Sequence, residues 1–384
     1  MTDHLRSLSN TGLYKSIVDP QKLAAQLESD MQSVNRDGHL HIEYDTSFAR
    51  ELLVSHQSVS QRNDSIALQR DKSDNFMFNH VEILNGNIGY VQFTGFSDFI
   101  KEAKPTISSA FRFVANSNAI IIDLRTNGGG NPGMVKQVAS YFVQERTHLN
   151  DIYERRRNKT KEFWAEPEDA DNMKLSMPVY ILTSKHTFSA AEDFTYAMQA
   201  NKRAVIVGDT TGGGAHPAGP VPIGQGFVVY IPFARSINPI TKTDWEGTGI
   251  LPDVPVAADE ALIKAQNLIL TKQLANTATD KQKRRIQWCI EALRVHDYDK
   301  SLNVEVLKTY AGEYDRFNVF VKDNELYLHD FVGRTFHLKP ITQTLFLAND
   351  WLQLEFLSTD GKVSELKMLG KPGWVNVMAK SKNP

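Results

Sequence analysis

Two segments of the sequence contain residues suited to acyl transfer. The first is a glycine loop, in which Asn127 precedes Gly128, Gly129 and Gly130, between an apolar segment and an expected helix. Glycines leave backbone N–H groups open to a ligand, and the N-terminus of a helix favours negative charge. The loop is therefore suited to stabilising an anion that develops during a reaction.

The second segment, Thr187 to Glu192, falls where an apolar strand is expected to turn into a helix. A serine at this point would lie at the carboxyl edge of a sheet, where α/β proteins bind ligands, and the N–H of Ala190 could contact an oxyanion. Ser189 followed by Glu192 three residues later is also a capping-box pattern, in which the serine only satisfies helix N–H groups. The segment alone leaves both interpretations open.

A serine hydroxyl is a weak nucleophile until a base accepts its proton. Catalytic groups meet in space, so sequence spacing does not choose the base. Four histidines are plausible: His39, His41, His186 and His216. A third segment, Asp244 to Asp253, contains two glycines that could hold the carboxylate of Glu246 in place, although a solvated loop acid is the commoner case.

The glycine loop also fits the spacing G-x-G-x-x-G through Gly128, Gly130 and Gly133, which is typical of dinucleotide binding. Asp151 lies near the distance expected for the acid that binds the ribose. Pro132, however, stiffens the turn where the pyrophosphate would approach, and the next clear parallel strand begins well after Asp151. A dinucleotide site is therefore the weaker alternative.

The composition indicates a globular protein with more than one domain. A chain of 384 residues exceeds the size at which one core usually keeps growing, and 41 % hydrophobic with 23 % charged residues is ordinary for a soluble protein. The net charge of -2 offers no basic field for nucleic acid. The single cysteine, Cys289, excludes an intrachain disulfide and a zinc site built on paired thiolates.

No membrane span or signal peptide is expected in the chain. No apolar run reaches about 18 residues, and the first ten residues lack the basic and apolar pattern of a leader. If the protein is exported, its leader is absent from this sequence. The oligomeric state is left open.

The order of expected elements favours an α/β fold class. Residues 1–77 are expected to be mainly helical, with a short strand after His39 and a polar connector from Ser58 to Asp74. Residues 78–258 alternate strands and helices, as in an α/β core. The strands expected there are residues 81–84, 88–93, 119–124, 179–183 and 204–208.

The remainder of the chain differs in pattern. Residues 259–305 favour a helical linker, because apolar residues recur there at helical spacing. Residues 306–384 alternate in the manner of strands and predict a small antiparallel β-barrel-like domain.

Taken in order, the motifs resemble the tail-specific, or C-terminal processing, serine peptidases. The closer branch contains the core of tricorn protease and the modules of interphotoreceptor retinoid-binding protein. The resemblance covers roughly residues 30–258. The matching segments are Asp37 to Leu40, Asn87 to Tyr90, Asp123 to Arg125 with the glycines after it, Phe188 to Glu192, Val207 to Gly212, and Glu246 to Asp253.

This resemblance implies a role for each candidate residue. Ser189 matches the nucleophile, His39 the general base and Glu246 the acid that orients the histidine. It also implies a crotonase-like ββα spiral for the core. The oxyanion hole that it implies consists of N–H groups of Gly128, Gly129 and Ala190.

The sequence departs from the family pattern in three places. The turn from Thr211 to Ala215 lacks the lysine of the serine–lysine enzymes, which favours the histidine branch. Gly38 stands where the tricorn-like site has a serine. Too few residues separate His39 from Val81 for the family's common PDZ domain, so substrate tails must be bound in another way.

The sequence therefore predicts a serine peptidase that forms an acyl-enzyme without a metal or organic cofactor. Its partner would be a peptide or protein substrate, added as a strand near Gly212, Gly213 and Gly214. The alternative is a non-catalytic binder of an apolar ligand or peptide on the same scaffold. By resemblance, an extracytoplasmic location, periplasmic or secreted, is expected.

Overall fold

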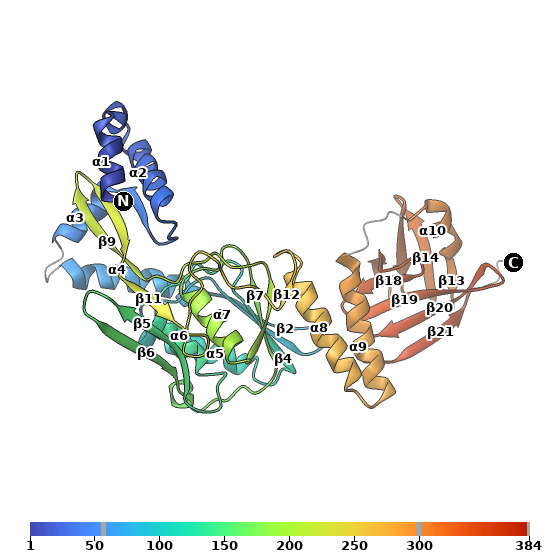
Figure 1. The fold of residues 1–384 in the computed structure, drawn as a ribbon. Helices are drawn as coiled ribbons and strands as arrows, with labels where there is room; N and C mark the ends of the chain where they lie inside the picture. Colours follow the sequence, from blue (N-terminus) through green and yellow to red (C-terminus); the bar gives the residue numbers. More distant parts are fainter. Residues whose placement is uncertain (55–58, 297–301, 382–384) are drawn as a thin grey trace. The chain divides into compact units, whose positions relative to one another are not determined.

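A computed structural model describes residues 1–54, 59–296 and 302–381. The chain forms two compact units, Met1–Leu262 and Ile263–Pro384 (Figure 1). Helices and sheets both contribute to the first unit, so the mixed α/β fold class is confirmed. No helix among the described residues is long and apolar enough to cross a membrane.

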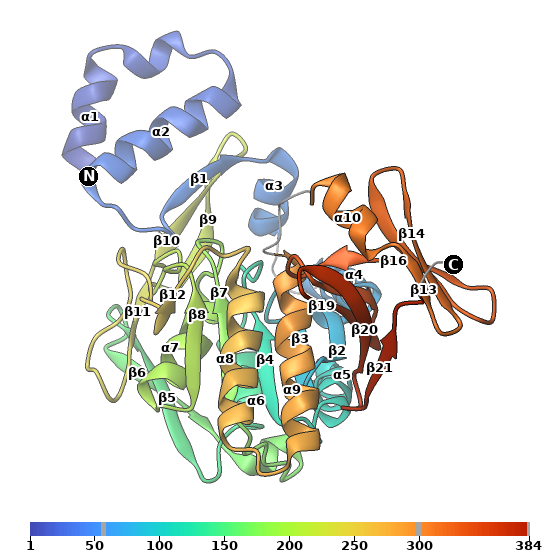
Figure 2. The ribbon, with the colours of Figure 1, turned by 90° about the vertical axis from the view of Figure 1, so that its right-hand side faces the viewer.

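A six-stranded sheet forms the centre of the first unit (Figure 2). Its order is β12-β8-β7-β4-β3-β2, and only the β2–β3 pair is antiparallel. Every residue of β4 and β7 is buried, which explains their continuous apolar sequence. The strands are β2 (Phe78–Leu84), β3 (Ile88–Phe93), β4 (Ala119–Asp123), β7 (Val179–Thr183), β8 (Ala204–Gly208) and β12 (Val254–Pro255).

The sheet packs with its crossover helices around one large core. Phe93, Phe111 and Phe194 are completely buried there, and burying one such side chain contributes roughly 1.5–3 kcal/mol. The helices are α5 (Ile100–Phe113), α6 (Pro132–Ala139) and α7 (Ala190–Ala200). The loops before α6 and α7 follow the neighbouring parallel strands β4 and β7, so they meet at one edge of the sheet.

Two smaller sheets complete the first unit. In one, β1 (His41–Tyr44) pairs with β10 (Phe227–Pro232), which pairs with β9 (Ala218–Gly224). In the other, β5 (Thr147–Glu154) pairs with β6 (Lys159–Ala165) and β11 (Ala234–Ile237). The β1–β10 pairing ties the segment that carries His39 to a hairpin far along the chain.

The N-terminal region contains several helices, and the expected polar connector is wrong. Val59–Ser73 forms a helix, α4, and Ser58 lies outside the described residues. The segment is polar, so its sequence gave little sign of a buried helical face, yet Leu68 packs against the main core. The other helices are α1 (Thr2–Asn10), α2 (Pro20–Val34) and α3 (Thr46–Val54), and the short 3₁₀ turns of the unit are Leu13–Ser16, Asn75–Met77 and Pro167–Ala170.

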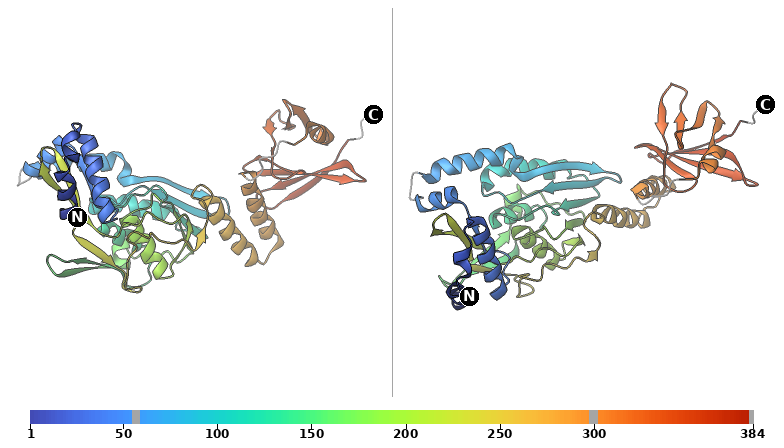
Figure 3. Two further views of the ribbon diagram at one scale, coloured as in Figure 1. Left: turned by 45° about the horizontal axis from the view of Figure 1, so that its top comes forward. Right: turned by 90° about the horizontal axis from the view of Figure 1, so that it is seen from above.

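The second unit joins helices to two antiparallel sheets (Figure 3). The indole N–H of Trp288 donates to the carbonyl of Leu369 at 3.0 Å, so α9 packs against the larger sheet. Its helices are α8 (Ala261–Ala275, which starts in the first unit), α9 (Asp280–Leu293), a 3₁₀ turn (Arg294–His296) and α10 (Val304–Tyr310). Its strands are β13 (Gly312–Tyr314), β14 (Phe317–Lys322), β15 (Glu325–His329) and β16 (Thr335–His337), then β17 (Lys339–Pro340), β18 (Leu345–Asn349), β19 (Leu352–Thr359), β20 (Lys362–Gly370) and β21 (Val375–Ala379).

Candidate active site

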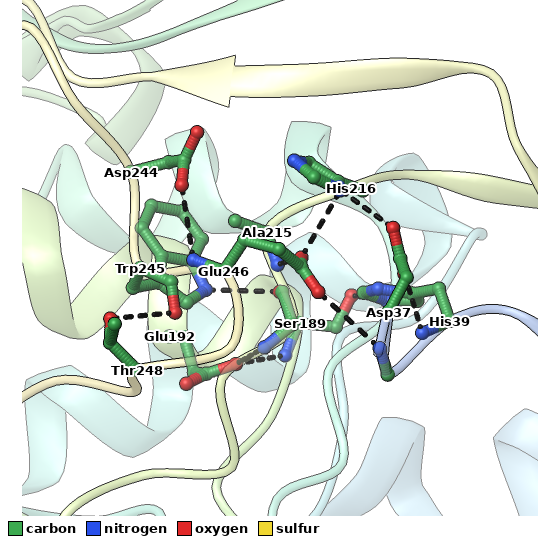
Figure 4. Close-up of polar contacts among 12 residues, drawn as sticks. Asp37, His39, Ser189, Glu192, Ala215, His216, Asp244, Trp245, Glu246 and Thr248 are labelled. Atoms are coloured by element: carbon green, nitrogen blue, oxygen red, sulfur yellow. Dashed lines mark hydrogen bonds and ion pairs between the residues drawn. The ribbon is translucent and has the colours of Figure 1, made fainter. Parts of the chain in front are cut away.

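Ser189 and His39 are 150 residues apart in the sequence, but their side chains touch. His39 Nε2 lies 3.0 Å from Ser189 Oγ, which is hydrogen-bonding distance (Figure 4). Ser189 directly precedes α7, and His39 lies in the turn before β1. Of the four histidines that spacing left open, His39 is the one in contact with the serine. His41 instead stacks on Tyr230, with ring centroids 4.0 Å apart.

The backbone of Ser189 adopts a conformation that favours glycine. Its φ is 54° and its ψ is -120°. A non-glycine residue held in such a region costs on the order of 1–3 kcal/mol, and these outliers cluster at functional sites. An ordinary N-cap residue has a β-region backbone instead. The strain therefore favours a functional role for this serine over a purely capping one.

Glu192 anchors the start of α7 to the glycine turn. Its carboxylate is completely buried and accepts hydrogen bonds from the N–H groups of Ser189 (3.0 Å), Gly213 (2.7 Å) and Gly214 (2.8 Å), and from the hydroxyl of Thr211. Burial raises the pKa of Glu192, although these four bonds oppose the rise. Sequence reasoning assigned Glu192 a capping role only, because spacing carries no sign of its bonds to the distant turn.

The glycine turn positions the site, and its N–H groups are not available to a substrate strand. The N–H of Gly212 donates to the carbonyl of Thr187 at 2.9 Å, and those of Gly213 and Gly214 donate to Glu192. The prediction that a substrate strand is added near Gly212, Gly213 and Gly214 stays a prediction, and such a strand would pair with groups other than these three N–H donors. Sequence spacing could not reveal that a buried carboxylate occupies two of these donors.

Gly214 allows the histidine to approach. A Cβ at this position would lie 2.8 Å from His39 Cε1 and 2.2 Å from Phe188 Cζ. We expect Gly214→Ala to lower kcat/KM by roughly 10²-fold, since a misplacement of about 1 Å can have that effect. Steady-state kinetics with Gly219→Ala as the control would test this, because a Cβ there meets Phe233 at an ordinary 3.7 Å. Wild-type turnover by Gly214→Ala would contradict the assignment.

The glycine loop after β4 lies against Ser189, but one of its expected oxyanion donors is already used. A Cβ on Gly129 would lie 2.7 Å from Ser189 Cβ. The Gly129 N–H donates to Asn127 Oδ1 at 2.9 Å, which corrects the prediction for this glycine. Among the described residues, no acceptor is found for the N–H groups of Gly128 and Ala190. Those two amides remain the candidates for an oxyanion hole.

Glu246 lies close to the histidine but is not hydrogen-bonded to it. Its carboxylate accepts from the N–H groups of Ala215 at 2.6 Å and Gly38 at 3.3 Å (Figure 4). His39 Nδ1 is buried and has no hydrogen-bond partner among the described residues. One oxygen each of Asp37 and Glu246 and one ring nitrogen of His39 lie within 4.8 Å of one another. The orienting role of Glu246 therefore stays a prediction.

A second histidine and a second acid join the cluster, and sequence reasoning missed the pairing. His216 Nδ1 lies 2.7 Å from Asp37 Oδ2 and 3.5 Å from Glu246 Oε2. Asp37 Oδ1 also accepts from the N–H of His39 at 3.0 Å. The pair thus connects the turn that carries His39 to the strand region after the glycine turn. The Asp37-Gly38-His39 motif indicated that Asp37 lies near the base. It did not indicate that His216 pairs with Asp37.

The surroundings of His39 favour its neutral form. Burial lowers the pKa of His39; the charge of His216 lowers it further, and Asp37 opposes this. The hydrogen bond to Asp37 raises the pKa of His216. Burial alone would raise the pKa of Asp37, but its bonds from His216 and the His39 amide outweigh that effect, so the pKa lies below its usual value. Burial raises the pKa of Glu246.

The dinucleotide interpretation is not supported by the topology. After α6 the chain enters the antiparallel β5–β6 pair of a separate sheet, not a parallel strand beside β4. Asp151 lies on β5, where its carboxylate is 2.8 Å from His148 Nε2. The Gly133 N–H donates to Asn131 Oδ1 at 2.7 Å. The βαβ unit that the motif requires is therefore interrupted.

Comparison with known proteins identifies related sequences. Residues 87–256 match the model of peptidase family S41, and residues 1–80 match the N-terminal domain of Peptidase_S41 in eukaryotic IRBP. The chain is 26 % identical over 181 residues to carboxyl-terminal-processing peptidase 2, chloroplastic, of Arabidopsis thaliana, covering 44 % of this chain and 32 % of the relative. It is 26 % identical over 173 residues to the carboxy-terminal processing protease CtpB of Bacillus subtilis, covering 44 % and 34 %.

The chain is also similar to solved structures. The photosystem II D1 C-terminal processing protease matches at 25 % identity with a TM-score of 0.39, over 45 % of this chain and 43 % of that one. A putative peptidase from Parabacteroides merdae matches at 22 % identity with a TM-score of 0.46, over 66 % and 84 %. The chain spans about a third of the length of the two curated relatives named above. Residues 87–256 therefore form a peptidase family S41 domain, and residues 1–80 match the N-terminal domain that accompanies it in eukaryotic IRBP.

Proposed function

We propose that this protein is a serine peptidase in which Ser189 is the nucleophile and His39 the general base. The observation that carries the proposal is the 3.0 Å contact between His39 Nε2 and the hydroxyl of a serine with strained backbone geometry. A nucleophile and a base within hydrogen-bond reach are the minimum arrangement for acyl transfer. The match of residues 87–256 to peptidase family S41 supports the same reaction class.

The reaction proceeds through an acyl-enzyme. Neutral His39 takes the proton of the Ser189 hydroxyl as its oxygen attacks the carbonyl carbon of a peptide bond. The N–H groups of Gly128 and Ala190 stabilise the negative oxygen, and losing one such donor typically costs about 3–4 kcal/mol of transition-state stabilisation. His39 then gives the proton to the leaving amine. Water, activated by His39 in turn, hydrolyses the ester.

Glu246 stabilises the imidazolium that forms on His39. Protonation leaves the buried Nδ1–H in need of an acceptor, and no described residue is hydrogen-bonded to this nitrogen in the resting arrangement. The Glu246 carboxylate belongs to the same small cluster, so its negative charge offsets the imidazolium charge. Asp37 lies in this cluster as well, and its bond to the His39 amide fixes the base in the turn.

The finer features expected from the family are also proposals. The succession of β2, β3, α5 and β4 supports a crotonase-like ββα spiral for the core. The antiparallel strands of the second unit support a small barrel-like module. The substrate would be a peptide or protein, and an extracytoplasmic location is expected from the family.

A digest of defined peptides tests the proposed function. The wild-type chain and Ser189→Ala are incubated with the same peptide mixture, and the products are identified by mass spectrometry. Cleavage of peptide bonds by the wild type, and its loss in Ser189→Ala, supports a peptidase. A wild-type chain that cleaves nothing but binds retinol or a peptide with saturation would instead be a non-catalytic binder.

The pH profile follows from the charge state of the base. Only neutral His39 accepts the proton of Ser189, so kcat/KM rises with pH through the pKa of His39 in the free enzyme. Because burial and His216 lower that pKa, we expect the midpoint of the acidic limb below the ordinary histidine value of 6.5. In His216→Gln the midpoint should move upward, since a neighbouring positive charge is removed. A wild-type midpoint clearly above 6.5 would contradict this assignment.

A further inference from the structure

A cavity whose lining includes two acids lies beside Ser189. Its volume is about 250 Å³, below the roughly 300–1,000 Å³ of pockets that hold a drug-sized ligand, so its size suits a single side chain. His39, Ser189 and Ala190 form one wall, so a group held in the cavity is next to the reacting atoms. The other residues that matter here are Asp98, Ile152, Asp193, Pro217, Ala218 and Ser236.

Two elements contribute buried polar side chains to the lining of the cavity. Asp193 lies on α7, four residues after Ser189 and therefore on the same face of the helix. Ser236 lies on β11, and both side chains are only 5 % exposed. Behind them, Asn150 of β5 is 1 % exposed and donates to Ser236 Oγ at 3.2 Å. A buried set of this kind is held in place by packing, as a specificity pocket requires.

Asp193 has no positively charged partner among the described residues. Within the described part of the chain, no Lys or Arg lines the cavity or pairs with Asp193. Burial raises the pKa of Asp193 to about 7, with a hydrogen bond to Asn150 opposing the rise. A buried carboxylate without a counter-ion is costly, and a cation brought beside it would relieve that cost.

The rim and walls complete a site for a long basic side chain. Asp98 lies at the rim, where its carboxylate accepts from Asn131 Nδ2 at 2.8 Å. Ile152, Pro217 and Ala218 supply apolar surface to the lining. Lys and Arg combine an aliphatic stem with a charged end, and such side chains bury the stem against apolar groups. Two carboxylates would repel the terminal carboxylate of a substrate chain.

We propose that this cavity binds the cationic side chain, Lys or Arg, of the substrate residue whose carbonyl Ser189 attacks. Asp193 is then a specificity-determining residue, and cleavage follows basic residues within a peptide. The inference rests on the proposed function, because it assigns the substrate class of the same site. If Asp193 only stabilised the positive N-terminal end of α7, the enzyme would show no preference for basic residues.

Matched fluorogenic peptides test the preference. The residue before the cleaved bond is Lys, Arg, norleucine or Glu, where norleucine is close to Lys in shape without its charge. We expect the wild type to cleave after Lys or Arg at least about 10-fold more efficiently, in kcat/KM, than after norleucine. In Asp193→Asn this ratio should fall close to one while cleavage after norleucine changes little. Glu102→Gln, an exposed acid on α5, should keep the wild-type ratio.

A binding measurement separates failure of this inference from failure of the proposed function. Benzamidine and neutral benzamide are titrated into Ser189→Ala protein, with ligand-observed NMR as the readout, so no turnover is needed. Saturable binding of benzamidine but not benzamide, lost when Asp193→Asn is added, supports the cationic site even in a protein that cleaves nothing. Equal cleavage after norleucine and Lys by the wild type, or benzamidine binding that survives Asp193→Asn, would overturn the site while leaving the peptidase proposal standing. Thermal unfolding of each variant shows whether it is folded. If Asp193→Asn does not fold, the wild-type ratio of kcat/KM after Lys or Arg to kcat/KM after norleucine decides whether the cationic site exists.

Discussion

Replacing Ser189 by alanine is expected to reduce kcat by roughly 10⁴-fold or more, the scale seen when the nucleophile of a serine peptidase is removed. The hydroxyl oxygen forms the covalent bond to the substrate carbonyl, and alanine offers no atom that can do so. The measurement is kcat for a peptide that the wild type cleaves. Ser109→Ala is the matched control, because Ser109 is exposed on α5 and its hydroxyl only contacts the Pro105 carbonyl.

Binding and stability should survive this substitution. Alanine keeps the N–H that donates to Glu192, so the start of α7 remains anchored. KM, thermal midpoint and circular dichroism are therefore expected to stay near the wild-type values. If Ser189→Ala retained more than about a tenth of the wild-type kcat, far above the residual rates expected without a nucleophile, another residue would have to be the nucleophile.

Replacing His39 by glutamine is the second large effect, again a loss in kcat of about 10⁴-fold or more. Glutamine cannot accept the serine proton at neutral pH, so the hydroxyl stays a weak nucleophile. The expected change in the free energy of unfolding is small, about 1 kcal/mol, the typical size for a single substitution. The structural reason is that no described residue is hydrogen-bonded to His39 Nδ1, and the ring contacts Phe188 with 4.7 Å between centroids.

The control for this variant is His41→Gln. His41 is two residues away and its ring stacks on Tyr230, so it shares the local strand but does not touch Ser189. We expect His41→Gln to keep kcat within a few-fold of the wild type. Equal losses in both variants would indicate that the β1 region had been disturbed as a whole, and the assignment of His39 as the base would be wrong.

Much of the first unit could be predicted because local patterns agree with the fold. Asn85-Gly86 marked the β2–β3 hairpin, and the apolar runs marked β4, β7 and β8. Helix α4 was missed because its sequence is polar and shows no clear apolar face. The order of strands in the sheet follows from long-range pairing, which no local pattern contains.

The candidate site was predictable in its residue types but not in its bonds. The motifs identified Ser189, His39 and Glu246, and the structure brings all three into one cluster. They could not show that Glu192 occupies the N–H groups of the glycine turn, or that Asn127 occupies that of Gly129. Hydrogen bonds across the fold depend on where side chains point, and family motifs record only which residues are present.

The Asp37–His216 pair is another contact of the site that the sequence could not predict. His216 was one of four candidate bases, and spacing offered no reason to place it beside Asp37. In the structure it stands 2.7 Å from that acid, so it affects the base through charge and does not contact the serine hydroxyl. Neighbouring charges that tune a pKa become visible only when the chain is folded.

The central claim is that His39 activates Ser189 in the folded protein. The most direct test is the rate of covalent labelling by a fluorophosphonate, with the modified residue identified by mass spectrometry, in the wild type and in His39→Gln. We predict that the wild type is labelled at Ser189 and that His39→Gln is labelled at least about 10²-fold more slowly, as expected from loss of general-base catalysis. A wild type that is not labelled at Ser189, or labelling that is equally fast without His39, would contradict the account.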